Sequence, residues 1–198
     1  MRRIFVCLPL VAVCLGAMGV RAFSGEVHQD KEPLAVISVA SYDRLMADVK
    51  LIGRLAGRPG LADGLQGMLA VVTQGRGLSG LDSSRPWGVV LTADGSTSAG
   101  YAFLPVDDPQ RFKEIFQPYT NAIVEGDDGV WKVRGRQRRQ TIYAKHIEPG
   151  WLLVCNTADG LAAIPDDPVV LLGNLAKDYD VACHVNLNRL PTAQREQW

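Results

Sequence analysis

The stretch WGVVLTADGSTSAGYAFL, residues 87–104, decides the fold class of this 198-residue chain. The sequence period is two on both sides of Asp94–Gly95, which is typical of β-strands, and Asp-Gly is a strong signal for a tight hairpin turn. The stretch therefore predicts two antiparallel strands, Trp87–Thr92 and Ser98–Leu104.

Toward the N-terminus, the pattern predicts one strand and two helices. Leu34–Ala40 is β-branched and apolar, which indicates a buried strand. Ser41 is placed to cap a helix over residues 42–56, and a second helix is expected over residues 61–74. Apolar residues recur at helical spacing in both helices, so each is expected to have an apolar face. The Arg58–Pro59–Gly60 segment separates them.

Toward the C-terminus, strands and short helices alternate. Asp107 or Asp108 is expected to cap a helix. Further strands are expected at residues 122–125, 130–133, 141–146, 151–155 and 180–187, with helices at 157–164 and 169–177. Interleaved elements with hairpins predict an α+β domain, in which helices pack on a largely antiparallel sheet. If the two early helices count as one crossover, residues 34–125 follow the β-α-β-β-α-β order of a ferredoxin-like core, with additional strands after it.

The N-terminus has the pattern of a secretory signal peptide. Arg2 and Arg3 precede an uncharged apolar run, Ile4–Val20, and Ala22 is the small residue before the expected cleavage site. The alternative is an uncleaved anchor, but the run is only about 17 residues long and contains Pro9. We therefore expect export to the periplasm or the extracellular space.

These patterns divide the chain into four parts. Residues 1–22 are the signal peptide, 23–33 a polar tail and 34–190 a single α+β domain, and a further helix, truncated by the end of the chain, is expected at 191–198. Without the three leader arginines, 18 basic residues face 21 acidic ones, a formal charge of −3. A chain so nearly neutral has no global field that would attract nucleic acid or an anionic membrane. No membrane span is expected after the leader.

Cys155 and Cys183 are the two cysteines outside the leader. Two cysteines do not form a zinc site alone, and no C-x-x-C motif is present. A helical crossover joins their strands, so the strands could lie side by side and allow a disulfide in an oxidising compartment. The alternative is that each cysteine packs as a small buried apolar residue.

Gly75–Gly80 matches G-x-G-x-x-G, the fingerprint of dinucleotide-binding loops. That chemistry needs a strand before the loop and a helix after it, so that the pyrophosphate meets the N-terminus of a helix. Here a helix precedes the loop, and only six residues separate it from the strand at Trp87. We therefore expect a structural loop and no cofactor.

Five cations lie between two expected strands: Lys132, Arg134, Arg136, Arg138 and Arg139. They are candidates for an anion-binding loop whose partner would be an anionic polymer or surface. The alternative is a solvated hairpin tip that protects a sheet edge. Nucleic acid is not expected, because no aromatic residue interleaves the run.

His146 and His184 are the only histidines in expected strands. If their strands paired, the two imidazoles and a nearby carboxylate could form a general-base or metal site. Two surface histidines are the simpler interpretation, since no ligand spacing supports a site.

The chain also carries short motifs in a fixed order: GLADGLQG (60–67), TQGRGLSGLD (73–82), RPWGVV (85–90), GVW (129–131), YAK (143–145), WLL (151–153), PDDP (165–168) and LLG (171–173). This series, over about residues 34–191, resembles a family of exported planctomycete proteins of unknown function. The resemblance implies export and assigns no catalytic residue. The basic run and the two cysteines are not features of that family.

Together these patterns predict an exported, non-enzymatic domain with a structural or binding role. The alternative function is a periplasmic hydrolase that uses His146 or His184 with a nearby carboxylate.

The first prediction concerns export. The mature protein should begin near Phe23, because Ala22 ends the signal-peptide pattern. N-terminal sequencing of exported material tests this, and recovery of intact Met1 from a membrane fraction would contradict it.

Overall fold

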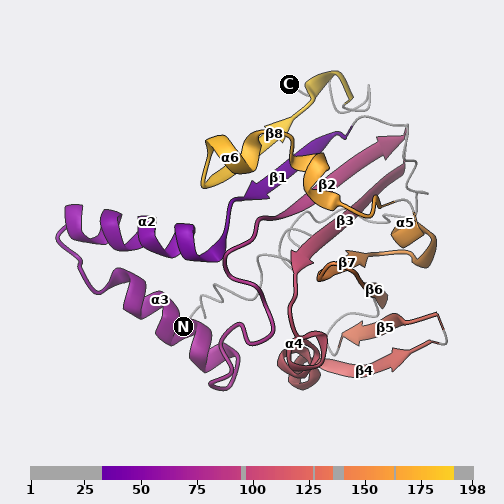
Figure 1. Cartoon of the computed structure of the whole chain (residues 1–198), viewed down its shortest axis with the longest axis horizontal. Coiled ribbons are helices and arrows are strands. Elements are labelled where there is room, and N and C mark those ends of the chain that lie inside the picture. Colours follow the sequence, from indigo (N-terminus) through magenta and orange to yellow (C-terminus); the bar gives the residue numbers. More distant parts are fainter. Residues whose placement is uncertain (1–32, 95–96, 127, 136–140, 163, 190–198) are drawn as a thin grey trace.

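The computed structural model describes residues 33–94, 97–126, 128–135, 141–162 and 164–189. In this part of the chain, eight strands form one sheet in the order β4-β5-β6-β7-β3-β2-β1-β8, with antiparallel neighbours throughout (Figure 1). The prediction of an α+β fold with a largely antiparallel sheet is therefore confirmed. The expected signal peptide and the expected helix at 191–198 lie outside the described residues.

The elements follow the predicted order closely. The strands are β1 (Ala35–Val39), β2 (Trp87–Asp94), β3 (Thr97–Pro105), β4 (Thr120–Glu125), β5 (Val130–Gly135), β6 (Thr141–Ile147), β7 (Trp151–Cys155) and β8 (Val181–Val185). The helices are α2 (Tyr42–Leu55), α3 (Leu61–Val72), α4 (Pro109–Phe116), α5 (Ala158–Ala162) and α6 (Leu175–Asp178), with short 3₁₀ helices η1 (Gln117–Tyr119), η2 (Pro168–Leu172) and η3 (Leu187–Arg189).

The sheet consists of two groups of strands joined by one pairing. The predicted β2–β3 hairpin is confirmed, but β2 extends beyond the expected end at Thr92, and its last residue, Asp94, lies opposite Thr97. The two residues between them lie outside the described residues. Strand β3 also pairs with β7, from Tyr101 opposite Cys155 to Pro105 opposite Trp151. This pairing connects β1, β2, β3 and β8 to the meander β4-β5-β6-β7.

The ferredoxin-like core is not confirmed. In that arrangement a helical crossover joins parallel strands that have another strand between them. Here β1 and β2 are direct antiparallel neighbours, with Ala35 opposite Leu91 and Val39 opposite Trp87. Figure 1 gives the reason: α2 and α3 form a hairpin that extends away from the sheet, so β2 returns beside β1.

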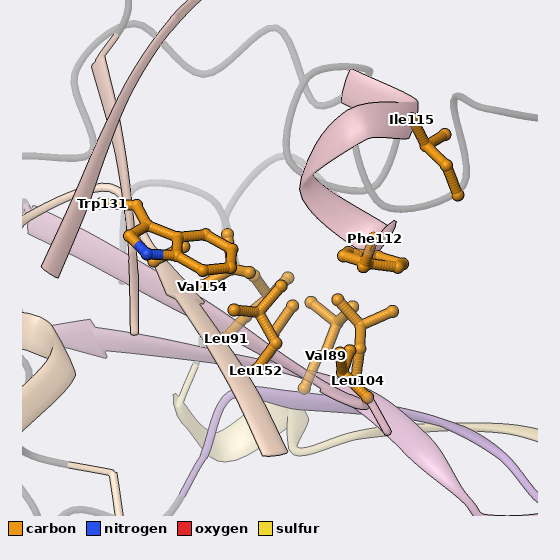
Figure 2. Close-up of a cluster of buried hydrophobic side chains, with 12 residues drawn as sticks. Val89, Leu91, Leu104, Phe112, Ile115, Trp131, Leu152 and Val154 are labelled. Atoms are coloured by element: carbon orange, nitrogen blue, oxygen red, sulfur yellow. The ribbon is translucent and has the colours of Figure 1, made fainter. Parts of the chain in front are cut away.

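Each face of the sheet has its own hydrophobic core, because the central strands alternate apolar residues on both faces. Figure 2 shows the first core, where Phe112 and Ile115 of α4 and the indole of Trp131 pack with aliphatic side chains of the sheet. The second core lies on the opposite face, where Leu161 of α5 and Leu172 of η2 pack with sheet residues.

Two aromatic residues shape the second core. The rings of Phe103 and Trp151 meet edge to face, with centroids 5.7 Å apart. Burial raises the pKa of Tyr101 to about 12, so its hydroxyl stays neutral at ordinary pH.

Local signals explain where several helices begin and end. Asp108 is the cap of α4, and its carboxylate accepts from the backbone N–H groups of Gln110 and Arg111. The single helix expected over 169–177 is instead η2 followed by α6. Gly173 separates them because its backbone adopts a φ of +55°, which a helix cannot contain.

The Gly75–Gly80 loop ends α3 and packs on the start of α4. Thr73 holds its first part, since the Thr73 hydroxyl donates to the Leu69 carbonyl and accepts from the Gly77 N–H, each at 2.8 Å. Gly80 holds its end, since the Gly80 carbonyl accepts from the N–H groups of Asp107 and Asp108. These hydrogen bonds connect the loop to α3 and α4, and the expectation that it binds no cofactor stays a prediction.

The second prediction compares Gly80→Ala with Gly77→Ala. Both glycines have a positive φ, but a Cβ on Gly80 would collide with the backbone of Asp108 and Phe112, whereas a Cβ on Gly77 meets nothing. Gly80→Ala should therefore lower the free energy of unfolding by about 1–3 kcal/mol more than Gly77→Ala. Urea denaturation measures both, and equal losses would show that the contact with α4 does not matter.

Candidate interaction surface on the α2–α3 hairpin

The α2–α3 hairpin forms because its sequence caps and breaks helices at defined points. Ser41 caps α2 as predicted, and its hydroxyl accepts from the Arg44 N–H at 3.1 Å. Gly57 has a φ of +70° just after α2, which is a common helix stop. Gly53 lets the returning chain approach closely, since a Cβ there would lie 2.7 Å from the Arg58 carbonyl oxygen.

Large apolar side chains of the hairpin are exposed. Leu55 and Val71 are each 81% exposed, and Ile52 is 57% exposed. The rest of the exposed apolar set is Leu51, Leu61 and Met68. The sequence places Ile52 and Leu55 on the apolar face of α2, where core packing is the usual outcome. That expectation is wrong for these residues, because the hairpin extends beyond the sheet (Figure 1).

The hairpin tip, defined as residues Lys50–Ala62, is positively charged. It contains Lys50, Arg54 and Arg58, all exposed, and no acidic residue. Leu51, Ile52 and Leu55 lie between these cations in the sequence, and Leu61 follows Arg58. The tip thus combines an exposed apolar surface with a local charge of +3 on a chain whose formal net charge is zero. An apolar patch with cationic neighbours is a candidate interaction site for an anionic, partly apolar partner.

The base of the hairpin makes an ion pair with Asp180, the residue before β8. Arg44 on α2 lies 2.7 Å from Asp180, measured from Nη2 to Oδ1. Asp48, one turn further along α2, is close to the same carboxylate. Desolvation and then the hydrogen bond and charge of Asp180 raise the pKa of Asp48, while Arg44 opposes the shift.

Of the five cations in the predicted anion-binding loop, the structure describes two. Lys132 and Arg134 lie on β5, both exposed and two residues apart, so they point to the same face of the sheet. The Lys132 ammonium lies 5.7 Å from the centre of the Tyr143 ring. Arg136, Arg138 and Arg139 lie outside the described residues, so the anion-binding loop stays a prediction.

The strand order contradicts the possible disulfide between Cys155 and Cys183. Both thiols are free; Cys155 is buried in β7, and Cys183 is exposed on β8. Three strands, β3, β2 and β1, lie between β7 and β8. At the usual strand spacing the two cysteines are about 19 Å apart across the sheet, whereas a disulfide needs Cα atoms within about 7 Å. The helical crossover does not make β7 and β8 neighbours, which the sequence argument assumed.

His146 and His184 do not form a common site. His146 on β6 is opposite Leu152 of the first core, whereas His184 on β8 is opposite Val36 of the second core, so the imidazoles lie on different faces. Four strands separate β6 from β8. Within the described ranges, no group of three or more His, Cys, Asp or Glu residues could hold a metal ion. The geometry therefore adds nothing in favour of the hydrolase alternative.

No protein-family model matches the chain, and no curated protein or solved structure matches it either. The resemblance to exported planctomycete proteins thus stays a prediction. In the described part of the chain, no helix has the length and apolarity needed to cross a bilayer.

The sequence analysis did not predict that the hairpin tip is a candidate interaction surface. The signal was present, because residues 50–62 contain three cations, no anion and four large aliphatic residues. Helical periodicity alone cannot distinguish an apolar face that packs on a sheet from one that remains exposed.

The third prediction concerns the base of the hairpin. Because the folded-state pKa of Asp48 is raised, its charged form costs stability at neutral pH, and this cost disappears as the pH falls below the ordinary Asp value of about 3.9. Asp48→Asn should therefore stabilise the protein at pH 7. The gain in stability should shrink toward zero as the pH falls from 7 to below about 3.9. Thermal melts over this pH range measure the effect. In an Asp180→Asn background the gain should be smaller, and a gain that does not depend on pH would refute the explanation.

Proposed function

We propose that this protein is an exported, non-enzymatic binding domain that docks on an anionic lipid surface through the hairpin tip. The observation that carries the proposal is the combination, in residues 50–62, of exposed Leu51, Ile52, Leu55 and Leu61 with three cations and no acidic residue. Helices that lie in a membrane interface combine an apolar face with Lys and Arg in this way.

The magnitudes favour reversible docking. A Lys or Arg near an anionic membrane surface contributes about 1 kcal/mol, so the three cations contribute about 3 kcal/mol. Burying one leucine side chain in the acyl boundary contributes about 1.5–3 kcal/mol. The cations alone do not offset the cost of association, which is at least about 4 kcal/mol, so binding should need apolar residues in addition to the cations.

An anionic lipid fits the tip better than the other anionic partners. Nucleic acid recognition of single strands uses aromatic stacking, and residues 50–62 contain no aromatic residue. A purely polar polysaccharide would leave Leu55 in water. An acyl chain covers these aliphatic groups while the headgroups meet Lys50, Arg54 and Arg58.

The fourth prediction tests this docking with the mature protein and phosphatidylcholine vesicles, with and without phosphatidylglycerol. Flotation should recover the protein with the anionic vesicles only, and added salt should release it by screening the cations. Replacing Lys50, Arg54 and Arg58 together by Gln should weaken binding about 100-fold. Leu55→Ser should weaken it about tenfold.

Val170→Ser is the matched control, because Val170 of η2 is another exposed aliphatic residue that lies outside the hairpin. It should leave vesicle binding unchanged. Equal binding to neutral and anionic vesicles, or no effect of Leu55→Ser, would overturn the proposal. Failure to bind vesicles, together with self-association that Leu55→Ser abolishes, would identify the tip as a protein interface instead.

A further inference from the structure

The outer edge of β8 is an exposed, regular strand edge. β8 is the last strand of the sheet and pairs only with β1 among the described residues. Its sequence, VACHV, contains no proline, lysine, arginine or acidic residue. Val181 is 53% exposed, Val185 is 45% exposed and Cys183 is also exposed.

The opposite edge of the sheet has the protection that β8 lacks. Strand β4 has a register shift between Thr120 and Ala122, and irregularities of this kind discourage pairing with another chain. Near its end, Glu125 forms a 3.0 Å ion pair with Lys113. Natural sheets protect an exposed edge by such features, and a regular, uncharged edge is a template for a further strand.

The backbone groups of β8 that point outward can be identified from its pairing with β1. The Ala40 N–H donates to the Asp180 carbonyl, and the Asn186 N–H donates to the Leu34 carbonyl. In an antiparallel ladder the residues alternate, so even-numbered residues of β8 bond to β1. The N–H and C=O groups of Val181, Cys183 and Val185 therefore point away from the sheet.

We infer that β8 pairs antiparallel with β8 of a second copy, in a two-fold symmetric dimer centred on Cys183. This register places Cys183 opposite Cys183 of the partner subunit and each Val181 opposite Val185 of the partner subunit. These three outward-pointing residues would form about six ladder hydrogen bonds across the interface. The interface joins the two sheets into one.

The side chains agree with this register on both faces. Cross-strand partners share a face, so Val181, Cys183 and Val185 lie on one side, and the dimer forms a continuous apolar stripe from both copies. At the strand ends, Tyr179 and Leu187 would be opposite each other, and both are exposed apolar residues.

The polar residues do not oppose the pairing. On the other face, Ala182 would be opposite His184, and beyond the strand Asp180 would be opposite Asn186. No two like charges are opposed, and like charges directly opposite destabilise a strand pair. A register shifted by two residues would instead place Cys183 opposite a valine and leave one valine without an apolar partner in β8.

The central cysteines allow a covalent test of this register. Cα atoms of a hydrogen-bonded antiparallel pair are about 5.5 Å apart, within the range of about 4.4–6.8 Å that a disulfide spans. With oxidised glutathione as oxidant, a Cys183 thiolate attacks the glutathione disulfide and releases one reduced glutathione. The partner's thiolate then attacks the mixed disulfide and releases the second, so two thiols become one disulfide.

The experiment combines sedimentation equilibrium with cross-linking of the mature protein by oxidised glutathione. The reduced protein should show a monomer–dimer equilibrium, and oxidation should give a covalent dimer on non-reducing gels. Cys183→Ser should abolish the covalent dimer only. Cys183→Asp should also abolish the reversible dimer, because it places two carboxylates opposite each other; circular dichroism confirms that this exposed position still folds.

Two further variants in the Cys183→Ser background test the register. Val181→Cys alone should cross-link at least about tenfold more slowly than the natural Cys183. In the proposed register the two residues 181 of the dimer are not opposite each other and lie too far apart for a disulfide. Val181→Cys with Val185→Cys should restore cross-linking, because these positions are opposite each other. A monomer at all concentrations would overturn the inference, as would equal cross-linking by Val181→Cys alone. These measurements need no lipid, so their outcome is separate from that of the vesicle test.

Discussion

The pairing of β3 with β7 is the contact on which the rest of the structure depends. It joins strands that are distant in sequence, with Tyr101 opposite Cys155 and Pro105 opposite Trp151. Without it, the chain would consist of two separate small sheets, each with exposed edges. Arg85 supports this junction from outside, since its guanidinium lies 4.0 Å from the centre of the Trp151 ring and donates to the carbonyls of Pro149 and Gly150.

Helices α4 and α5 and the 3₁₀ helix η2 lie where they cover the apolar faces of the eight-stranded sheet. Its central strands present apolar side chains on both faces, so both faces need cover. Helix α4 covers one face at Phe112 and Ile115, while α5 and η2 contribute Leu161 and Leu172 to the other. The α2–α3 hairpin contributes no residue to either buried core. Ile52, Leu55 and Val71 are among the apolar residues of the hairpin that remain exposed, because the hairpin does not cover the sheet.

The sequence predicts the local elements well because the forces that set them are local. Ser41 and Asp108 cap helices that begin at the next residue, and the Asp94–Gly95 signal marks the end of β2, where the chain turns back to pair as a hairpin with β3. Each of these outcomes depends on hydrogen bonds or turn geometry within a few residues.

Strand order and exposure depend on contacts between distant segments, and here the sequence is insufficient. The apolar residues of β8 resemble those of β7, yet β7 is buried throughout and β8 is a mostly exposed edge. Val181 is exposed because β1 covers only one side of β8. The same reasoning separates Cys155 from Cys183 and makes Ile52 a surface residue. The position of a strand in the sheet decides the first two cases, and the position of α2 beyond the sheet decides the third; periodicity encodes neither.

Strand β1 brings the two proposed surfaces together in the fold. It pairs with β8 along its whole length and leads through Ala40 and Ser41 directly into α2. Asp180, just before β8, accepts from the Ala40 N–H and forms the ion pair with Arg44 of α2. Asp180 therefore contacts both the end of β1 and the start of α2, next to the strand that forms the exposed edge.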